Sequence, residues 1–206
     1  MIFDPQTAAL ADVLRWRRDV RHFREDPIPE TTLLALQKAM DMAPSVGNSR
    51  PWRVIRVEDP QIRIQMRMIF DNQNALAACA YKGTAQAEYR RLKLSGLDRA
   101  PVQLAVFTDT DPAQGRGLGR QTMPETLVQS TIMAIFALWL SARAHNLGLG
   151  MVSILDPDAV LRLFDPPPNW RFTAYLCLGW PESHDDVPLL DRVGWQKNQP
   201  TPWQRR

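Results

Sequence analysis

The sequence predicts an α+β fold with four or five strands, several helices and one domain. Short stretches rich in Val, Ile and aromatic residues, such as residues 51–59 and 100–110, have strand character. Longer stretches between them carry apolar residues at helical spacing. The chain has 206 residues, of which 45% are hydrophobic, so it can build one substantial core but not two comfortable ones.

The N-terminal quarter predicts two helices and a strand. Residues 6–17 place apolar side chains on one side of a helix. A second helix begins near Pro29, which suits a first turn, and ends before Pro44. Residues 51–59 then alternate apolar and basic side chains, as a half-buried strand does.

The middle of the chain predicts a helical region, a strand and a loop. Residues 60–94 have a helical pattern that breaks near Lys82 and Gly83. Residues 100–110 are apolar enough to form a central strand. Residues 111–125 are Gly-rich but lack the GK[ST] of a phosphate loop, and we interpret them as a mobile loop.

The C-terminal half predicts one long helix, two strands and a tail. The helix at residues 125–146 is apolar on nearly all sides, which suggests that a second subunit covers part of it. Strands are expected within 146–157 and 169–181. Residues 182–206 cannot build a core of their own, so we expect them to form an extended arm that lies across a surface, either of the same chain or of a homodimer partner.

The basic residues are mostly arginines. The net charge of +3 is too small to indicate nucleic-acid binding. However, 21 arginines stand against four lysines, and the planar arginine fork suits phosphate and carboxylate groups. A GC-rich genome that favours arginine codons explains the excess equally well.

The sequence predicts a cytoplasmic protein without a metal site. Its two cysteines have no CxxC or histidine spacing around them, which argues against a disulfide framework or a zinc site. The N-terminus lacks the basic start and apolar run of a signal peptide. The longest apolar stretch, IMAIFALWLSA at 132–142, is too short to span a bilayer.

The motif RRDVR, residues 17–21, is a candidate anion site. If the first helix ends near it, Arg17 and Arg21 lie one turn apart and can approach one anion with charge-assisted hydrogen bonds. The alternative is a solvated helix end with salt bridges along the helix. An acid at position 19 is unexpected in an anion site, because Asp19 repels phosphate.

The motif APSVGNSRPW, residues 43–52, is a second candidate. Ser45 and Asn48 follow a helix stop and precede a strand, so the loop offers backbone N–H groups, a hydroxyl and an amide in fixed geometry. A plain helix-to-strand turn is the alternative.

Together these two motifs resemble the flavin-binding segments of the nitroreductase family. Two further segments match: NLGLGMVSI at 146–154, and LGWPESHDDVPLLDR at 178–192, which ends in Arg192. The resemblance covers nearly the whole chain. It implies a central, mostly antiparallel sheet flanked by helices, a long buried central helix, and an intertwined homodimer that binds FMN at the subunit interface.

Within the family, the sequence is most similar to a branch that consumes its flavin. The pointers are Asp19, where most members have Ser, the serine of GMVSILDP (Ser153), and the segments at 89–101, 123–126 and 137–150. This branch implies O2-dependent fragmentation of reduced FMN to 5,6-dimethylbenzimidazole and erythrose 4-phosphate, in biosynthesis of the lower ligand of vitamin B12. The alternatives are a conventional FMN-dependent NAD(P)H oxidoreductase and a flavin-binding protein without turnover.

The resemblance also assigns residues to the flavin. The implied contacts are Arg17, Arg18, Arg21, Ser45, Asn48, Leu94, Gly150 and Arg192. The arginines are expected at the phosphate and ribityl chain, and the loop residues Ser45 and Asn48 are expected to come from the second subunit. Leu94 and Gly150 are expected to approach the ring through backbone atoms.

Asp19 and Ser153 are the expected catalytic residues. A carboxylate near the ring can act as a base, and a hydroxyl can both donate and accept a hydrogen bond. The alternatives are that Asp19 only orients a neighbouring arginine and that Ser153 is an ordinary strand-end hydroxyl. Arg50 departs from the family pattern, which commonly has Gln at that position, and its role is open. A flavin reductase that supplies reduced FMN is a possible partner.

Overall fold

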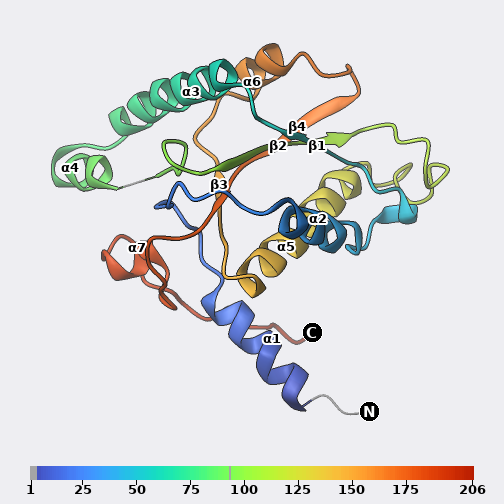
Figure 1. The fold of residues 1–206 in the computed structure, drawn as a ribbon, viewed down its shortest axis with the longest axis horizontal. Helices are drawn as coiled ribbons and strands as arrows, with labels where there is room; N and C mark the ends of the chain where they lie inside the picture. Colours follow the sequence, from blue (N-terminus) through green and yellow to red (C-terminus); the bar gives the residue numbers. More distant parts are fainter. Residues whose placement is uncertain (1–3, 93) are drawn as a thin grey trace.

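Four strands form the middle layer of the molecule in the computed structural model, which describes residues 4–92 and 94–206 (Figure 1). The strands are β1 (Trp52–Arg56), β2 (Val102–Asp109), β3 (Gly148–Val152) and β4 (Trp170–Gly179). The helices are α1 (Asp4–Trp16), α2 (Glu30–Asp41), α3 (Pro60–Cys79), α4 (Gly83–Arg91), α5 (Thr126–Ala144), α6 (Pro157–Phe164) and α7 (Leu189–Arg192), with a 3-10 turn η1 (Val46–Asn48).

The sheet has the order β1-β2-β4-β3, and every neighbouring pair is antiparallel. β2 lies between β1 and β4, so the prediction of a central strand at 100–110 is confirmed. Its side chains are buried on both faces because helices cover both sides of the sheet, which is why its sequence is almost continuously apolar. The predicted α+β class with an antiparallel sheet is confirmed.

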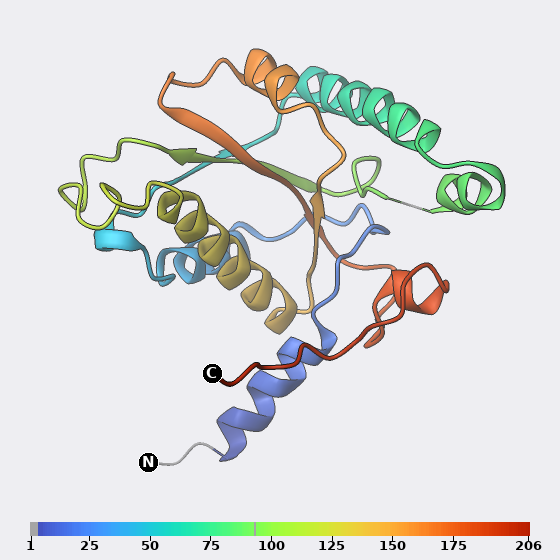
Figure 2. The same ribbon diagram turned by 180° about the vertical axis from the view of Figure 1, so that it is seen from behind.

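Helices cover the two faces of the sheet (Figures 1 and 2). α2 and α5 lie on one face, where Leu36 and Leu138 belong to one core cluster. α3 and α6 lie on the other face, where Met66 and Val160 belong to a second cluster. α6 is an eight-residue helix that the sequence did not predict, and it follows the side-chain cap Asp156.

α5 is the long apolar helix, and one stripe of it is uncovered in this chain. Ala134 and Leu138 are buried, but Ile132, Met133 and Phe136 are 43%, 41% and 42% exposed. The sequence predicts that a second subunit covers part of this helix, and the exposed stripe is the part that the single chain leaves uncovered. By length and composition α5 could cross a bilayer, but core helices share these properties, and α5 packs against α2 and the sheet.

The Gly-rich segment 111–125 packs tightly against η1, so its interpretation as a mobile loop is wrong. A Cβ on Gly115 would lie 2.8 Å from the Gly47 carbonyl oxygen, and both glycines have positive φ, of 87° and 57°. The Gln114 side-chain amide donates a hydrogen bond of 2.7 Å to the Asn48 carbonyl oxygen. Such interlocked backbones are possible only where side chains are absent.

The C-terminal arm lies on the surface of the molecule. Trp195 packs edge-on against Tyr81, with ring centroids 5.4 Å apart, and it also contacts Tyr89 of α4. The last residues run back beside α1 in both views (Figures 1 and 2). Trp203 is 95% exposed in the single chain.

Candidate active site

The segment that follows α1 runs alongside β3. Asp19 forms an isolated parallel bridge with Leu149, and the Val20 N–H donates a hydrogen bond of 3.1 Å to the Leu149 carbonyl oxygen. A Cβ on Gly150 would lie 2.1 Å from the Val20 carbonyl oxygen. This position therefore requires glycine, because the two backbones approach too closely for any side chain.

The segment is extended, so the expectation that Arg17 and Arg21 lie one helical turn apart is wrong. α1 ends at Trp16, and pairing with β3 holds the next residues extended. The arginines nevertheless meet. A cavity of about 110 Å³ is lined by Arg17, Arg18, Asp19, Arg21 and Arg192, all predicted site residues, together with Trp139, Arg143 and His184.

Asp19 is held at both carboxylate oxygens. Its Oδ1 accepts a hydrogen bond of 3.0 Å from the Met151 N–H, and its Oδ2 accepts one of 2.8 Å from Arg21 Nε. The Asp19 side chain remains 32% exposed, and each carboxylate oxygen has a second lone pair. Asp19 is thus fixed in direction by β3 and Arg21 and can still accept a further proton or hydrogen bond.

Two carboxylates in the loop before α7, Asp185 and Asp186, form ion pairs with arginines near the cavity. Arg192 pairs with Asp185, and Arg15 Nε donates to Asp186 Oδ2 at 2.7 Å. Arg18 instead donates to the carbonyl oxygens of Arg17 and Asp186. Its Nε is buried without a hydrogen-bond partner in the described part of the chain. A buried unpaired donor of this kind favours a ligand that accepts hydrogen bonds.

Arg17 is the cation most affected by burial. Its guanidinium carbon lies 4.9 Å from the centre of the Trp139 ring and 6.0 Å from that of Phe136. Burial, and next the charge of Arg18, lower the pKa of Arg17 below its usual value. A desolvated cation without a carboxylate partner gains more from an anion than a solvated cation does.

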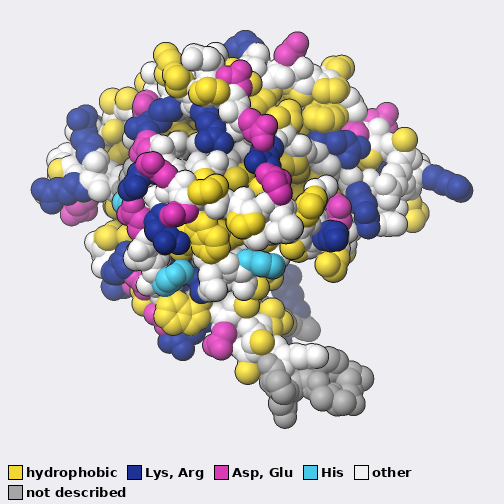
Figure 3. All heavy atoms as spheres, viewed as in Figure 1, with side chains coloured by type: hydrophobic (Ala, Val, Ile, Leu, Met, Phe, Trp, Pro, Cys, Tyr) yellow, Lys and Arg dark blue, Asp and Glu magenta, His cyan; other side chains and the backbone are white. Residues whose placement is uncertain are grey.

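Trp139, Arg143 and His184 were missed as site residues. Trp139 lies within the apolar stretch 132–142, which favours a core position, but its indole N–H donates a hydrogen bond of 3.2 Å to the Arg18 carbonyl oxygen. A sequence signal did exist, since Trp139 and Arg143 are four residues apart on α5 and thus share one helix face. Figure 3 shows acidic and basic side chains interleaved around this region, with histidines among them.

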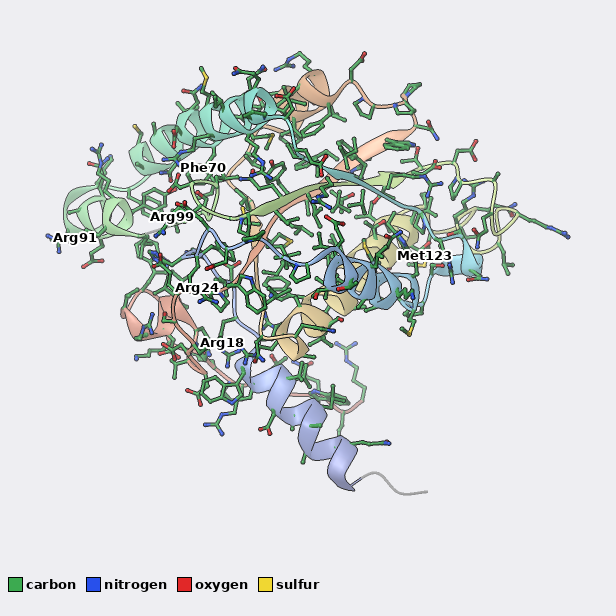
Figure 4. The ribbon with its side chains drawn as sticks, viewed as in Figure 1. Arg18, Arg24, Phe70, Arg91, Arg99 and Met123 are labelled. Carbon is green, nitrogen blue, oxygen red and sulfur yellow. The ribbon has the colours of Figure 1, made fainter. Side chains whose placement is uncertain are left out.

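Ser45 and Asn48 lie elsewhere, at the N-terminal end of α5. Ser130 on α5 accepts a hydrogen bond of 3.0 Å from the Val46 N–H, whereas Arg143 near the other end lines the arginine cavity. These two α5 residues are separated by about 20 Å along the helix axis. In Figure 4, Arg18 and Met123 of the Gly-rich segment accordingly lie on different sides of the molecule.

The loop that carries Ser45 is itself well ordered by local contacts. Ser45 Oγ accepts a hydrogen bond of 3.0 Å from the Arg50 N–H. Asn48 and Arg50 both adopt positive φ, of 54° and 42°. Ser49 Oγ is buried and has no hydrogen-bond partner among the described residues. The loop therefore presents polar groups in a strained conformation, which is frequent at functional sites.

The remaining predicted residues border the Asp19 region. Ser153 follows β3, is exposed, and lies two residues beyond Met151, which is about 7 Å along an extended chain. Leu94 packs against the core cluster that contains Phe23. A Cβ on Gly96 would lie 2.3 Å from Phe23 Cε2, so the segment after α4 closely approaches the arginine segment. Lys93 in this segment lies outside the described residues.

A larger cavity of about 580 Å³ lies between α2 and β1. Its lining is about half aliphatic and includes the carboxylates of Glu30 and Asp41. Two of its three arginines already hold carboxylates: Arg53 with Asp109 at 2.7 Å and Arg56 with Glu30 at 2.6 Å. It therefore attracts an anion less than the arginine cavity does. Over residues 4–92 and 94–206, no three His, Cys, Asp or Glu side chains are grouped as metal ligands.

Comparisons with known proteins agree with this fold. The family model of the nitroreductase family matches residues 14–180. The chain is 62% identical over 198 residues to a 5,6-dimethylbenzimidazole synthase of Rhodobacter capsulatus, with 96% of each chain covered. It is 51% identical to a 5,6-dimethylbenzimidazole synthase of Rhodospirillum rubrum, over all of this chain and 98% of that one.

A solved structure shows the same fold at lower identity. Oxidized iodotyrosine deiodinase, bound to FMN and 3-iodo-L-tyrosine, superposes with a TM-score of 0.73 at 23% identity. The superposition covers 96% of this chain and 97% of that one.

Proposed function

The chain belongs to the nitroreductase family, and we propose from this premise that it is a 5,6-dimethylbenzimidazole synthase. Its substrates are reduced FMN and O2, and its products are 5,6-dimethylbenzimidazole and erythrose 4-phosphate. FMN is consumed in this reaction, since it supplies both the reactivity toward O2 and the atoms of the product. The proposal rests on the two relatives that bear this name at 62% and 51% identity over nearly the whole chain.

The arginine cavity fits the phosphate of FMN. Arg17 and Arg18 have no carboxylate partner within residues 4–92 and 94–206, and Arg18 Nε is a buried donor that lacks an acceptor. A phosphate monoester supplies three acceptor oxygens and nearly two negative charges at neutral pH. Arg21 and Arg192 would contribute charge at the rim of the same cavity, although each is also paired with a carboxylate.

Asp19 is the proposed base. The Met151 N–H and Arg21 direct its carboxylate, and its free lone pairs can take a proton from the ribityl chain or from a flavin nitrogen. The alternative, in which Asp19 serves only to orient Arg21, predicts that loss of the carboxylate weakens FMN binding. Gly150 has no side chain, so the backbone of β3 lies in contact with the backbone of Val20. We propose that the flavin ring lies against the backbone of β3 at this position.

Ser153 is proposed to hold a hydrogen bond to the reacting part of the ring. Its hydroxyl has no hydrogen-bond partner within the described chain and is exposed just past β3. Leu94 follows α4 and would cover the ring. These two roles are proposals drawn from position along the segments that border Asp19.

We propose that the active enzyme is a homodimer and that each site takes residues from both chains. Ser45 and Asn48 lie near the end of α5 remote from the arginine cavity, so a second chain must bring them to the flavin. The exposed apolar stripe of α5 and the exposed Leu10 of α1, at 54%, supply an interface. Residues 1–206 are treated as one FMN-binding domain, with 182–206 as an arm across the surface.

We place the enzyme in the cytoplasm, because both cysteines are free thiols and FMN must arrive in reduced form. A flavin reductase is a suitable source of that substrate. The alternative function is a conventional FMN-dependent NAD(P)H oxidoreductase, which needs space above the ring for a nicotinamide. The identity to the two synthases favours the first function.

The test uses purified protein mixed with chemically reduced FMN and then exposed to air. Chromatography is expected to show 5,6-dimethylbenzimidazole in amounts that match the flavin lost. Recovery of intact FMN, with only hydrogen peroxide released, would overturn the proposal. Activity with NAD(P)H and a nitro compound, without flavin loss, would favour the oxidoreductase instead.

Two substitutions test the catalytic roles. Asp19→Asn and Ser153→Ala are each expected to lower product formation by about 100-fold or more while FMN affinity stays within a few-fold, because base catalysis contributes on this scale. Flavin fluorescence titration measures the affinity. Full product yield in both variants would show that neither Asp19 nor Ser153 is catalytic. Loss of FMN binding by Asp19→Asn would show that Asp19 has a structural role instead.

A further inference from the structure

We propose that Arg143 is a further phosphate-binding residue, which makes the site selective for phosphorylated flavin, and that His184 is the positioning residue that orients it. This inference rests on the proposed function, because the phosphate is that of FMN. It adds a contact from α5 to a cavity whose other arginines come from the segment 17–21 and from α7.

The Arg143 guanidinium is oriented by neutral acceptors. Its Nη1 lies 2.9 Å from His184 Nδ1, and its Nη2 donates a hydrogen bond of 3.2 Å to Asn146 Oδ1. A guanidinium can only donate, so His184 Nδ1 must accept and the imidazole proton must be on Nε2. Arg143 therefore keeps its full positive charge at the cavity, and the described chain offers it no carboxylate.

The distribution of carboxylates separates the cations of this cavity into two groups. Arg21 is paired with Asp19, and Arg192 is paired with Asp185. The cations without a carboxylate partner in residues 4–92 and 94–206 are Arg17, Arg18 and Arg143. An incoming phosphate dianion is attracted most strongly to this second group, because their charge is not already compensated.

His184 has the protonation state that this role requires. Burial lowers the pKa of His184, and the charges of Arg143 and Arg24 lower it further. At neutral pH the imidazole is therefore neutral and can accept from Arg143. A protonated ring would lose this acceptor and would repel the guanidinium, although Asp185 and Asp186 of the same loop would partly offset that charge.

The competing role for Arg143 is structural. It lies in the last turn of α5, where a cation interacts favourably with the helix dipole. A purely structural residue would affect riboflavin and FMN equally, because the two flavins share the ring and ribityl chain and differ only in the phosphate. Comparison of the two ligands therefore separates the roles.

The experiment measures the affinities of oxidised FMN and of riboflavin for the full-length protein by flavin fluorescence. Arg143→Gln is expected to weaken FMN binding by about tenfold to 100-fold, the scale of a charge-assisted hydrogen bond, and to leave riboflavin within twofold. Arg143→Lys keeps the charge without the fork, so its loss is expected to be smaller. The matched control is Arg162→Gln on α6, at the opposite side of the molecule (Figures 1 and 2), with no expected effect on either ligand.

Substitution of His184 tests the positioning role. His184→Leu removes the acceptor and is expected to weaken FMN several-fold without affecting riboflavin. His184→Asn retains an acceptor near the Nδ1 position and is expected to restore most of the affinity. Equal loss in the Asn and Leu variants would show that His184 does not act by orienting Arg143.

The outcomes separate this inference from the proposed function. Unchanged FMN affinity in Arg143→Gln, or equal losses for FMN and riboflavin, would overturn the role of Arg143. If Arg143→Gln does not fold, Arg143→Met decides, because it removes the charge but keeps an unbranched side chain. A ratio of FMN to riboflavin affinity equal to that of the wild type in this variant overturns the role. FMN binding without benzimidazole formation would overturn the synthase only. Failure of the wild-type protein to bind FMN would overturn both.

Discussion

Replacement of Gly150 by alanine tests whether the close approach of two backbones positions Asp19. The new Cβ would lie 2.1 Å from the Val20 carbonyl oxygen, where ordinary contacts begin at 3.4 Å. It would also lie 3.5 Å from Asp19 Oδ1, so the carboxylate itself is not hit directly. The segment that carries Asp19 must therefore move away from β3 by roughly 1 Å, and this movement is on the scale that costs about 100-fold in rate.

The same movement has a cost in stability. It stretches the hydrogen bond of 3.1 Å from the Val20 N–H to Leu149 and the one of 3.0 Å from the Met151 N–H to Asp19. Overpacking costs about 1–3 kcal/mol, and each of the two weakened hydrogen bonds adds about 0.5–1.5 kcal/mol. We expect a total of about 2–6 kcal/mol, which lowers the Tm by about 4–24 °C in a protein of this size.

The assay combines thermal unfolding with benzimidazole formation from reduced FMN in air. Gly83→Ala is the control, because nothing lies within 4 Å of its added Cβ although φ is +59°. It is expected to cost about 1 kcal/mol from backbone strain and to retain activity. If Gly150→Ala keeps both its Tm and its rate within twofold of the wild type, the close approach does not position Asp19 and the reasoning is wrong.

Three further predictions concern residues outside the cavity. Asp109→Ala is expected to cost about 3 kcal/mol in urea unfolding, because Asp109 is largely buried and accepts from Arg53 at 2.7 Å and Asn169 at 2.7 Å; a loss under 1 kcal/mol would contradict this. Cys177 is buried and Cys79 is exposed, so a thiol reagent should modify one cysteine in the native protein and two after unfolding. Rapid modification of both thiols in the native protein would contradict the burial of Cys177. Burial raises the pKa of Cys177 from 9.0 to about 12, so the native state keeps a proton that the unfolded chain loses, and stability should fall between these pH values. The slope is about 1.4 kcal/mol per pH unit for that thiol, and Cys177→Ala should remove it from the alkaline unfolding profile.

Local sequence patterns were sufficient to predict most of the elements. The strand at 102–109 and the helix at 126–144 are long periodic or continuous apolar segments, which identify themselves without tertiary information. The break between α3 and α4 was predictable because a glycine, Gly83, interrupts the helical pattern. In the structure Gly83 adopts a φ of +59°, which favours glycine. α6 was missed because an eight-residue helix next to a strand end carries too few apolar repeats to be recognised.

The candidate site depended more on tertiary contacts. The segment 17–21 directly follows the predicted helix at 6–17 but lies extended, because Asp19 and Val20 pair with β3, 130 residues away in the chain. No local pattern indicates that the loop before α7 would hold Arg192 and contact Arg18. The motif resemblance placed the predicted arginines in one site, and the structure brings them to one cavity. The matching segments include Arg143 and His184, but the resemblance gave neither residue a role, because only the fold shows that they line the cavity.

α5 separates the loop of Asn48 from the arginine cavity of the same chain by about 20 Å. This separation determines how two inactive variants should behave when they are mixed. In the proposed dimer, one site takes Arg17 from the first chain and Asn48 from the second, and the other site takes the reverse pair. A chain substituted at Arg17 and a chain substituted at Asn48 each form inactive dimers alone. In a dimer of one of each, both defects fall in the same site and the other site is intact. Random exchange should therefore restore about a quarter of the wild-type activity.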